Sequence, residues 1–248
     1  MEKNKRFLIT GASSGIGNAT AKHLLSCGYN VVATARNSEK LISDFGDRKN
    51  CIVIPWDFSD IDSIKGYVKT VNEKAGTING LVHFSGIQKT MPVHMLKPAI
   101  VRDIFEINTF TAMLLVAGFS KKGMFDPGSA SFVLISSIAA HDGAYGHSVY
   151  AASKGALEGF LHSVTPELAE KGIRINALAP GNVNTPMMDS FTSHLPEDQI
   201  DEIKSDYPLG WGEPEDIAEL VEFLLNEKSR WITGKVHFID GGFLERKC

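Results

Sequence analysis

Short runs of apolar, mostly β-branched residues alternate along the chain with longer stretches of helical periodicity. The apolar runs predict strands at 7–10, 31–33, 52–54, 81–84, 132–135, 174–178 and 235–239. The helical stretches lie at 19–25, from about 38, 59–74, 96–122, 150–171 and 217–225. Strands that are apolar throughout and separated by helices are typical of a parallel sheet with helices on both faces. We therefore expect an α/β fold with a doubly wound, seven-stranded parallel sheet.

The alternation is interrupted in the carboxyl-terminal third of the chain. From Pro180 to Pro214 the helical pattern is weak, and four prolines follow Pro180. A long irregular insertion in a compact domain commonly forms a lid or a binding loop. We expect one domain over residues 1–248, with a substrate loop or lid at about 182–213.

Composition excludes several classes of protein. The 248 residues carry a net charge of -4 and no basic patch, which argues against a nucleic-acid partner. No apolar run approaches the roughly 20 residues of a membrane span, and no secretory signal precedes the first strand. The three cysteines, Cys27, Cys51 and Cys248, fit neither a disulfide framework nor a zinc site. We expect a soluble, cytoplasmic protein with no membrane partner and no bound metal.

A glycine-rich loop follows the first predicted strand and opens the first helix, because Thr10–Gly17 reads Thr-Gly-Ala-Ser-Ser-Gly-Ile-Gly. Glycines at this place let the backbone approach a pyrophosphate, which binds the free N–H groups of the helix N-terminus. This context is typical of a Rossmann-type dinucleotide site, and a tight turn that binds nothing is the alternative. The candidate contacts are Gly11, Ser13, Ser14, Gly15, Ile16 and Gly17.

The end of the second predicted strand distinguishes the two nicotinamide cofactors. An NAD site places a carboxylate there to bind the ribose 2′-hydroxyl, whereas positions 34–37 read Thr-Ala-Arg-Asn, without an acid. Arg36 offers a fork of donors that suits a 2′-phosphate, although surface arginines are common at helix entrances. We expect NADP(H) to be preferred over NAD(H).

Tyr150 and Lys154 are spaced i and i+4 in a predicted helix and therefore share one face. A free phenol has a pKa of roughly 10, so a tyrosine that accepts protons near neutrality needs a nearby positive charge to stabilise its phenolate. Ser136 and Ser137 end the fifth predicted strand, at the edge where α/β sheets bind ligands. A hydroxyl there can donate a hydrogen bond to a carbonyl oxygen that becomes an alkoxide.

With the TGxxxGxG loop, the serine-ended strand and Tyr-x3-Lys, residues 5–242 resemble the short-chain dehydrogenase/reductase family. The resemblance implies an oxidoreductase in which Tyr150 is the general acid/base. It also implies that Lys154 binds the nicotinamide ribose and lowers the pKa of Tyr150. The serine that polarises the carbonyl lies 13 positions before the tyrosine in that family, which favours Ser137 over Ser136.

The resemblance assigns the remaining cofactor and catalytic positions. Asn108 matches the asparagine that holds a proton-relay water, and Asp57, with its neighbour Phe58, matches the position that contacts the adenine. The other cofactor positions follow the fourth and sixth predicted strands and are Ser85, Gly86, Pro180, Gly181, Val183 and Thr185. Val183 and Thr185 would hold the carboxamide of the nicotinamide.

The chain departs from the family pattern in the fourth strand and in the glycine loop. The family's fourth strand usually ends Asn-Asn-Ala-Gly, but here it ends His83-Phe84-Ser85-Gly86, which keeps the glycine and loses the amide contacts. We interpret His83 as a packing residue of the sheet rather than as a catalyst. Ser14 stands where some NADP-preferring relatives carry a basic residue, which removes one support for NADP(H).

Two groups of residues lie where a substrate would bind, and each has two interpretations. The group before Tyr150 forms either a polar pocket wall or ordinary exposed positions: His141, Tyr145 and His147. The group after Thr185 forms either an apolar lid or the attachment of this segment to the core: Met187, Met188 and Phe191.

We expect hydride transfer between NADP(H) and a ketone, an aldehyde or a secondary alcohol. Positions 231–242 resemble bacterial 3-ketoacyl-carrier-protein reductases, but 127–131 reads Pro-Gly-Ser-Ala-Ser, without the basic residues that dock an acidic carrier. The alternatives are a non-catalytic dinucleotide-binding sensor or scaffold and a sugar-nucleotide-modifying enzyme. The resemblance implies a homotetramer or a homodimer, packed through the helices at 108–122 and 150–171.

Overall fold

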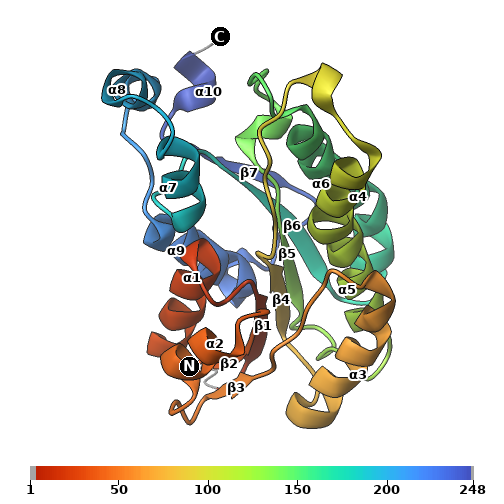
Figure 1. Cartoon of the computed structure of the whole chain (residues 1–248). Helices are drawn as coiled ribbons and strands as arrows, with labels where there is room; N and C mark the ends of the chain where they lie inside the picture. The colour runs from red at the N-terminus through yellow and green to blue at the C-terminus, as the bar shows by residue number, and fades with distance from the viewer. Residues whose placement is uncertain (1–3, 247–248) are drawn as a thin grey trace.

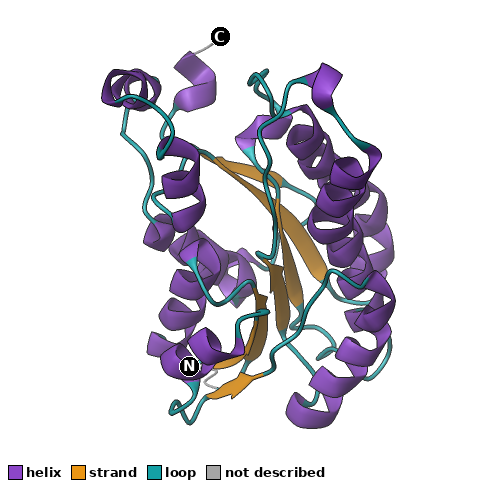
Figure 2. Cartoon of the chain, in the orientation of Figure 1, coloured by secondary structure: helices purple, strands orange, loops and turns teal. Residues whose placement is uncertain are grey.

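The computed structural model describes residues 4–246, and in this part of the chain seven strands form one parallel sheet. The strand order is β3-β2-β1-β4-β5-β6-β7, with helices on both faces (Figures 1 and 2), which confirms the doubly wound α/β fold. The strands are β1 Arg6–Thr10, β2 Asn30–Thr34, β3 Cys51–Val53, β4 Gly80–His83, β5 Ser131–Ile135, β6 Arg174–Pro180 and β7 Val236–Ile239.

The sheet separates two apolar cores, because successive side chains of a strand point to opposite faces. Leu8 of β1 packs into one core and Ile9 into the other, and both are fully buried. One layer consists of α1 Gly15–Ser26, α2 Ser38–Phe45 and α9 Pro214–Leu225. The opposite layer consists of α3 Ile64–Ala75, α4 Pro98–Phe105, α5 Thr111–Phe119 and α6 Ser148–Glu170.

The strand order reverses between β1 and β4, which are hydrogen-bonded neighbours. The chain leaves β1 toward β2 on one side and leaves β4 toward β5 on the other, so the loops after these strands diverge. Divergence of this kind opens a crevice at the carboxyl edge of a parallel sheet, where ligands of such folds bind. The glycine loop and the Ser85–Gly86 segment therefore lie next to each other at this edge.

The predicted helix at 96–122 is interrupted in its middle. The structure has α4, then a single π-helical turn at Glu106–Phe110, and then α5. Apolar periodicity continues through such a turn, so the sequence pattern could not locate it. Turns of this kind are frequent at functional sites, and this one contains Asn108.

The expectation that 180–214 is irregular was wrong. The segment contains α7 Pro186–Thr192 and α8 Glu197–Ser205, and a short helix, α10 Phe243–Arg246, follows the last strand. Both α7 and α8 have local start signals: the Thr185 hydroxyl accepts a hydrogen bond from the Met188 N–H, and two acids open α8. Their short length explains the weak periodicity.

Cys27 and Cys51 are free thiols, and Cys248 lies outside the described residues. Within residues 4–246, no helix is long and apolar enough to cross a membrane. The same residues contain no cluster of three or more side chains that could hold a metal ion.

His83 is a buried packing residue that joins two strands to the π-helical turn. Its Nδ1 lies 2.8 Å from Oγ1 of Thr10, and its Nε2 lies 3.1 Å from the carbonyl oxygen of Ile107. A carbonyl only accepts, so Nε2 carries the hydrogen and Nδ1 accepts from the threonine hydroxyl. Burial lowers the pKa of His83 to about 4, which keeps the ring neutral.

This low pKa predicts a pH-dependent loss of stability. Between pH 6.5 and pH 4 the unfolded His83 takes up a proton and the folded one does not. Lowering the pH from 6.5 to 4 should therefore reduce the free energy of unfolding by about 3 kcal/mol from this group alone. Denaturant unfolding of wild type and His83→Asn at both pH values measures the effect. Equal losses in the two proteins would contradict the assignment.

Candidate active site

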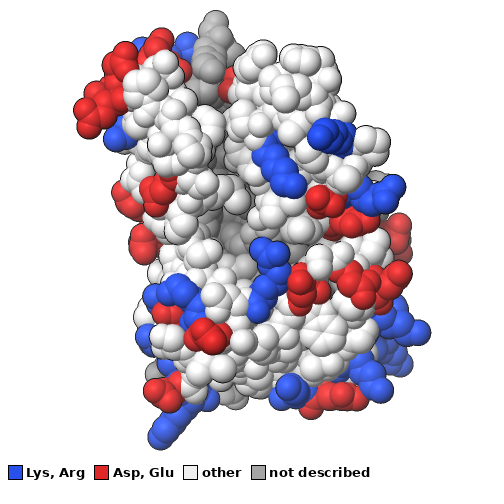
Figure 3. Space-filling model, in the orientation of Figure 1, with Lys and Arg blue, Asp and Glu red and all other residues white. Residues whose placement is uncertain are grey.

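A cavity of about 580 Å³ opens at the carboxyl edge of the sheet, where the strand order reverses. The space-filling view shows the groove between the half with α7 and α8 and the half with α4 and α6, and most of its visible wall is uncharged (Figure 3). Most predicted cofactor residues line this cavity: Gly11, Ser13, Ser14, Gly15, Ile16, Gly17, Arg36, Asp57, Phe58, Ser85, Gly86, Tyr150, Lys154 and Thr185.

The glycine loop leaves the N-terminus of α1 accessible to a negatively charged group. Gly11 has φ of +67°, and a Cβ there would lie 2.8 Å from the backbone nitrogen of Ser85. A Cβ on Gly17 would overlap the carbonyl oxygen of Gly11. Ser14 caps α1 without a side-chain hydrogen bond, and no acid occupies the first turn. The free N–H groups and the positive end of the helix therefore fit a pyrophosphate.

Arg36 follows β2 and faces the cavity with its side chain exposed. Its neighbour Asn37 is the N-cap of α2, and its Oδ1 accepts a hydrogen bond of 2.9 Å from the Lys40 N–H. Asp57 also lines the cavity, and its Oδ1 accepts a hydrogen bond of 3.0 Å from the Ser59 N–H. The segment directly after β2 thus presents a guanidinium and no carboxylate to the cavity.

Lys154 is buried on α6, and its ammonium group has a defined partner. Nζ donates a hydrogen bond of 2.7 Å to the carbonyl oxygen of Ile135, at the end of β5. It also lies 5.7 Å from the centre of the Tyr150 ring. Burial lowers the pKa of Lys154 to about 8, because the charged form loses hydration there.

The lowering of the Tyr150 pKa by Lys154 stays a prediction. Burial raises the pKa of Tyr150, and a hydrogen bond from Ser137 opposes the rise. Loss of hydration penalises the phenolate, and the ammonium group lies over the ring, where it is directed toward the carbonyl of Ile135. Among the described residues, burial therefore has the largest effect on the pKa of Tyr150.

The two serines after β5 have different environments. Ser136 is 1% exposed, and its hydroxyl donates a hydrogen bond of 2.5 Å to Oε1 of Glu158. Ser137 is less buried and interacts with Tyr150, and its Oγ accepts a hydrogen bond of 3.2 Å from the Ala139 N–H. Accepting from the backbone leaves the Ser137 hydrogen available to an oxygen in the cavity, which agrees with the choice of Ser137.

Asn108 lies in the π-helical turn and does not line either cavity described here. Its Oδ1 accepts a hydrogen bond of 2.8 Å from the Ile87 N–H, and its Nδ2 donates to the Ile87 carbonyl at 3.0 Å and to Ser153 Oγ at 3.1 Å. The side chain therefore joins the segment after β4 to α6. A Cβ on Gly86 would lie 3.3 Å from its Oδ1 and 3.8 Å from Nζ of Lys154.

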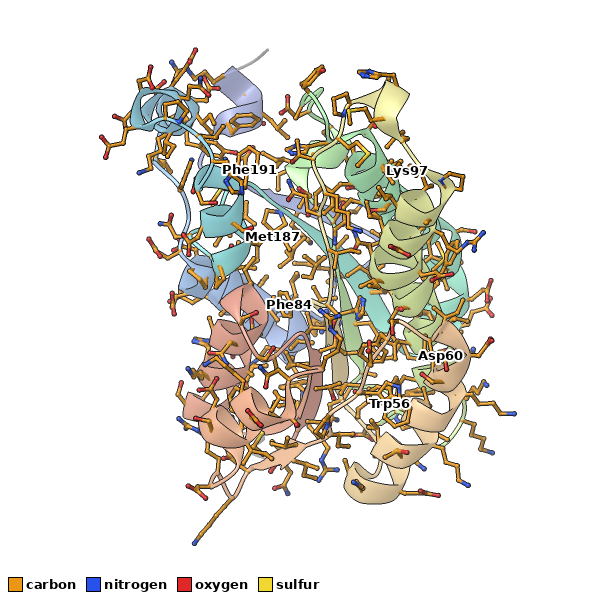
Figure 4. All side chains as sticks on the ribbon, viewed as in Figure 1. Trp56, Asp60, Phe84, Lys97, Met187 and Phe191 are labelled. Carbon is orange, nitrogen blue, oxygen red and sulfur yellow. The ribbon has the colours of Figure 1, made fainter. Side chains whose placement is uncertain are left out.

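A second cavity of about 350 Å³ adjoins the first, and Tyr150 and Thr185 line both. Ser137, Pro180, Gly181 and Val183 line this second cavity. Figure 4 shows Met187 and Phe191 on the side of α7 that faces the sheet. The sequence-based candidates for substrate contact that line it are Tyr145, His147, Met187, Met188 and Phe191. His141 does not line it and is paired with Glu158 instead.

Sequence reasoning missed several residues of both cavities. Trp56 lines the first, and Tyr207 and Phe243 line the second, where their rings stack at 4.6 Å. Trp56 directly precedes the predicted Asp57, so its position was a usable signal. Tyr207 and Phe243 had no signal, because they reach the site only through the packing of α8 and α10.

The fold and this pair of cavities define a dinucleotide-binding oxidoreductase, and comparison with known proteins identifies the family. A family model described as enoyl-(acyl carrier protein) reductase matches residues 11–244. The chain is 34% identical over 235 residues to carbonyl reductase family member 4 of Xenopus laevis, which covers 94% of this chain and 95% of the relative. The protein belongs to the short-chain dehydrogenase/reductase family.

Other relatives agree with this assignment. A 3-oxoacyl-(acyl-carrier-protein) reductase of Thermotoga maritima is 34% identical over 250 residues, 98% of each chain. Among solved structures, an actinorhodin polyketide ketoreductase with NADPH superposes with a TM-score of 0.90 at 28% identity, covering 98% of each chain. Nicotinamide dinucleotides are thus bound by structural neighbours that share this architecture.

Gly86 offers a direct test of the larger cavity. The added methyl of Gly86→Ala would enter the space beside Asn108 and Lys154, so NADPH affinity should fall about 10-fold or more. Gly159→Ala is the matched control, because a Cβ on Gly159 meets no atom within 4 Å. Fluorescence titration with NADPH measures the affinity, and thermal unfolding checks the fold. Unchanged affinity in Gly86→Ala would place the cofactor elsewhere.

Proposed function

We propose that the protein is an NADP(H)-dependent reductase of ketones or aldehydes, able to oxidise the corresponding secondary alcohols. The observation that carries the proposal is the position of Tyr150, on the wall shared by the two cavities, with Ser137 in the smaller cavity and Lys154 in the larger one. A carbonyl compound in the smaller cavity would thus lie beside both hydroxyl groups and next to the dinucleotide.

The reaction needs one hydride and one proton. A bound nicotinamide supplies the hydride to the carbonyl carbon. Tyr150 gives its phenolic proton to the carbonyl oxygen, and the hydroxyl of Ser137 donates a hydrogen bond to the same oxygen as negative charge develops. The raised pKa of Tyr150 suits this direction, because burial keeps the proton on the phenol until the oxygen takes it.

Lys154 and Asn108 also contribute to this arrangement. The Lys154 ammonium donates one hydrogen bond to the Ile135 carbonyl, and Lys154 lines the larger cavity, where its remaining N–H groups would bind the ribose of the dinucleotide. Asn108 holds the backbone of Ile87 beside this group.

The preference for NADP(H) over NAD(H) rests on Arg36. Its guanidinium can form two parallel hydrogen bonds with a phosphate, and no carboxylate directly after β2 competes for the ribose. Ser14, which is exposed at the N-terminus of α1, adds a neutral donor and no charge. We therefore expect the preference to depend on this one cation.

The smaller cavity supports a substrate of modest size with an apolar body. Its volume is about 350 Å³, and α7 contributes Met187, Met188 and Phe191 to its wall. The segment at 182–213, which includes α7 and α8, would act as the lid over the substrate. The loop at 127–131 offers no basic residue, so direct binding of a free carbonyl compound is favoured over delivery by an acidic carrier.

The alternatives are weaker on specific grounds. A non-catalytic sensor would not need Ser137, Tyr150 and Lys154 around adjoining cavities. A sugar-nucleotide-modifying enzyme needs more room than the smaller cavity offers. A homotetramer or homodimer stays a prediction, and the exposed Phe110 and Leu114 would be covered in it.

Removing the phenolic hydroxyl tests the mechanism. Tyr150→Phe should lose at least about 1,000-fold in kcat, because no other group can give the proton to the carbonyl oxygen. Binding of NADPH should persist. Tyr29→Phe is the control, since Tyr29 lines neither cavity. NADPH absorbance with a panel of ketones and aldehydes measures turnover, and wild-type rates in Tyr150→Phe would refute the mechanism.

Removing the guanidinium tests the cofactor preference. Arg36→Ala should weaken NADPH binding by about 10- to 100-fold, the effect of losing charge-assisted hydrogen bonds, and should leave NADH binding unchanged. Arg48→Ala is the control, because Arg48 is exposed and does not line the cavity. A wild-type protein that prefers NADH, or an Arg36→Ala variant with the same ratio of affinities, would contradict the proposal.

A further inference from the structure

Glu158 is a buried acid of α6 that the proposed reaction does not use. The residue is only 9% exposed, and its carboxylate has two side-chain partners, of which His141 lies within hydrogen-bond distance of both oxygens. Oε1 accepts a hydrogen bond of 2.5 Å from the Ser136 hydroxyl, and Oε2 lies 2.8 Å from Nε2 of His141. A carboxylate only accepts, so His141 donates this second bond through Nε2.

The two partners of Glu158 lie at opposite ends of the segment that carries Ser137. Ser136 follows the last residue of β5, and His141 follows the 3-10 turn Ile138–Ala140. Ser137 caps that turn by accepting from the Ala139 N–H. One carboxylate therefore holds the segment on both sides of Ser137.

The same helix carries the acid/base residue, so the carboxylate also sets a distance between elements. Tyr150, Lys154 and Glu158 follow one another at intervals of four residues along α6. The Ser136 hydroxyl also lies 3.3 Å from the Lys154 carbonyl oxygen. Residues spaced in this way share a face of the helix, and this face meets the end of β5.

Burying a carboxylate costs desolvation free energy, and apolar residues of the same size often join two elements as stably. Such groups are retained where they specify one geometry. Ser136 does not fit the role of a nucleophile activated by His141, because the Glu158 carboxylate lies between the two side chains. The Ser136 side chain is also buried. His141 packs edge-on against Phe238 of β7 at 4.8 Å, which orients its ring.

We propose that Glu158 is a positioning residue that, through Ser136 and His141, fixes Ser137 relative to Tyr150. This inference rests on the proposed function, in which Ser137 donates to the carbonyl oxygen. Without the carboxylate, the segment 136–141 loses the hydrogen bonds that Ser136 and His141 make to the Glu158 side chain. The Ser137 hydroxyl then spends less time within hydrogen-bond distance of the carbonyl oxygen of the substrate.

A double-mutant cycle tests this role. Glu158→Leu should lower kcat for a ketone about 10-fold at saturating NADPH, the cost of a displaced catalytic group, with little change in NADPH affinity. Ser137→Ala should cost much less in the Glu158→Leu background than in wild type, because the serine is already misplaced there. Fully additive effects would show that Glu158 does not act through Ser137 and would overturn the proposal.

Two further variants separate positioning from general stability. Glu222→Leu is the matched control, because Glu222 is a partly buried acid of α9 bonded to Tyr29 at 3.1 Å, remote from the site. It should lower the melting temperature and leave kcat unchanged. Glu158→Gln retains the size and one acceptor oxygen, so it should fold even where Glu158→Leu does not and should lose less kcat.

Hydrogen exchange provides a readout that does not depend on turnover. Amides of segment 136–141 should exchange faster in Glu158→Leu and Glu158→Gln than in wild type, and no faster in Glu222→Leu. If no ketone is turned over by wild type, the proposed function fails, while faster exchange would still support the role of Glu158 in this segment. Unchanged exchange, together with additive kinetics, would refute the positioning role.

Discussion

Close packing of the glycine loop against the carboxyl end of β4 is the constraint on which the active site depends. A Cβ on Gly11 would lie too close to the backbone nitrogen of Ser85, and a Cβ on Gly17 would overlap the carbonyl oxygen of Gly11. This packing brings the N-terminus of α1 to the point where the strand order reverses. The pyrophosphate position, the larger cavity and the distance to α6 all follow from that contact.

Helix α6 supplies the second fixed element, because its one face carries Tyr150, Lys154 and Glu158. Each of these side chains interacts with the end of β5 or with the segment after it: Tyr150 with Ser137, Lys154 with Ile135, and Glu158 with Ser136. Tyr150, Lys154 and Ser137 are thus held by a single helix–strand junction. The wall of the smaller cavity also includes Met187, Met188 and Phe191 of α7.

Much of this site was predictable, and the exceptions share a physical cause. The strands, the glycine loop and the Tyr-x3-Lys pair depend on local patterns, and the structure reproduces them. The π-helical turn at Asn108 and the high pKa of Tyr150 depend on what surrounds each residue. The hydrophobic periodicity of the sequence does not reveal a π-helical turn that keeps the apolar face of the helix. The spacing of Tyr150 and Lys154 does not reveal how strongly burial desolvates the phenol.

The sequence by itself determined the fold class, the cofactor loop and the residues that can carry the chemistry, because backbone propensity and spacing along one element are local properties. Only the tertiary structure decided that the two adjacent serines have different hydrogen-bond partners, that burial raises the pKa of Tyr150, and that Glu158 joins Ser136 to His141. These outcomes depend on burial and on contacts between residues distant in the chain. Such contacts exist only once the sheet and α6 have packed together.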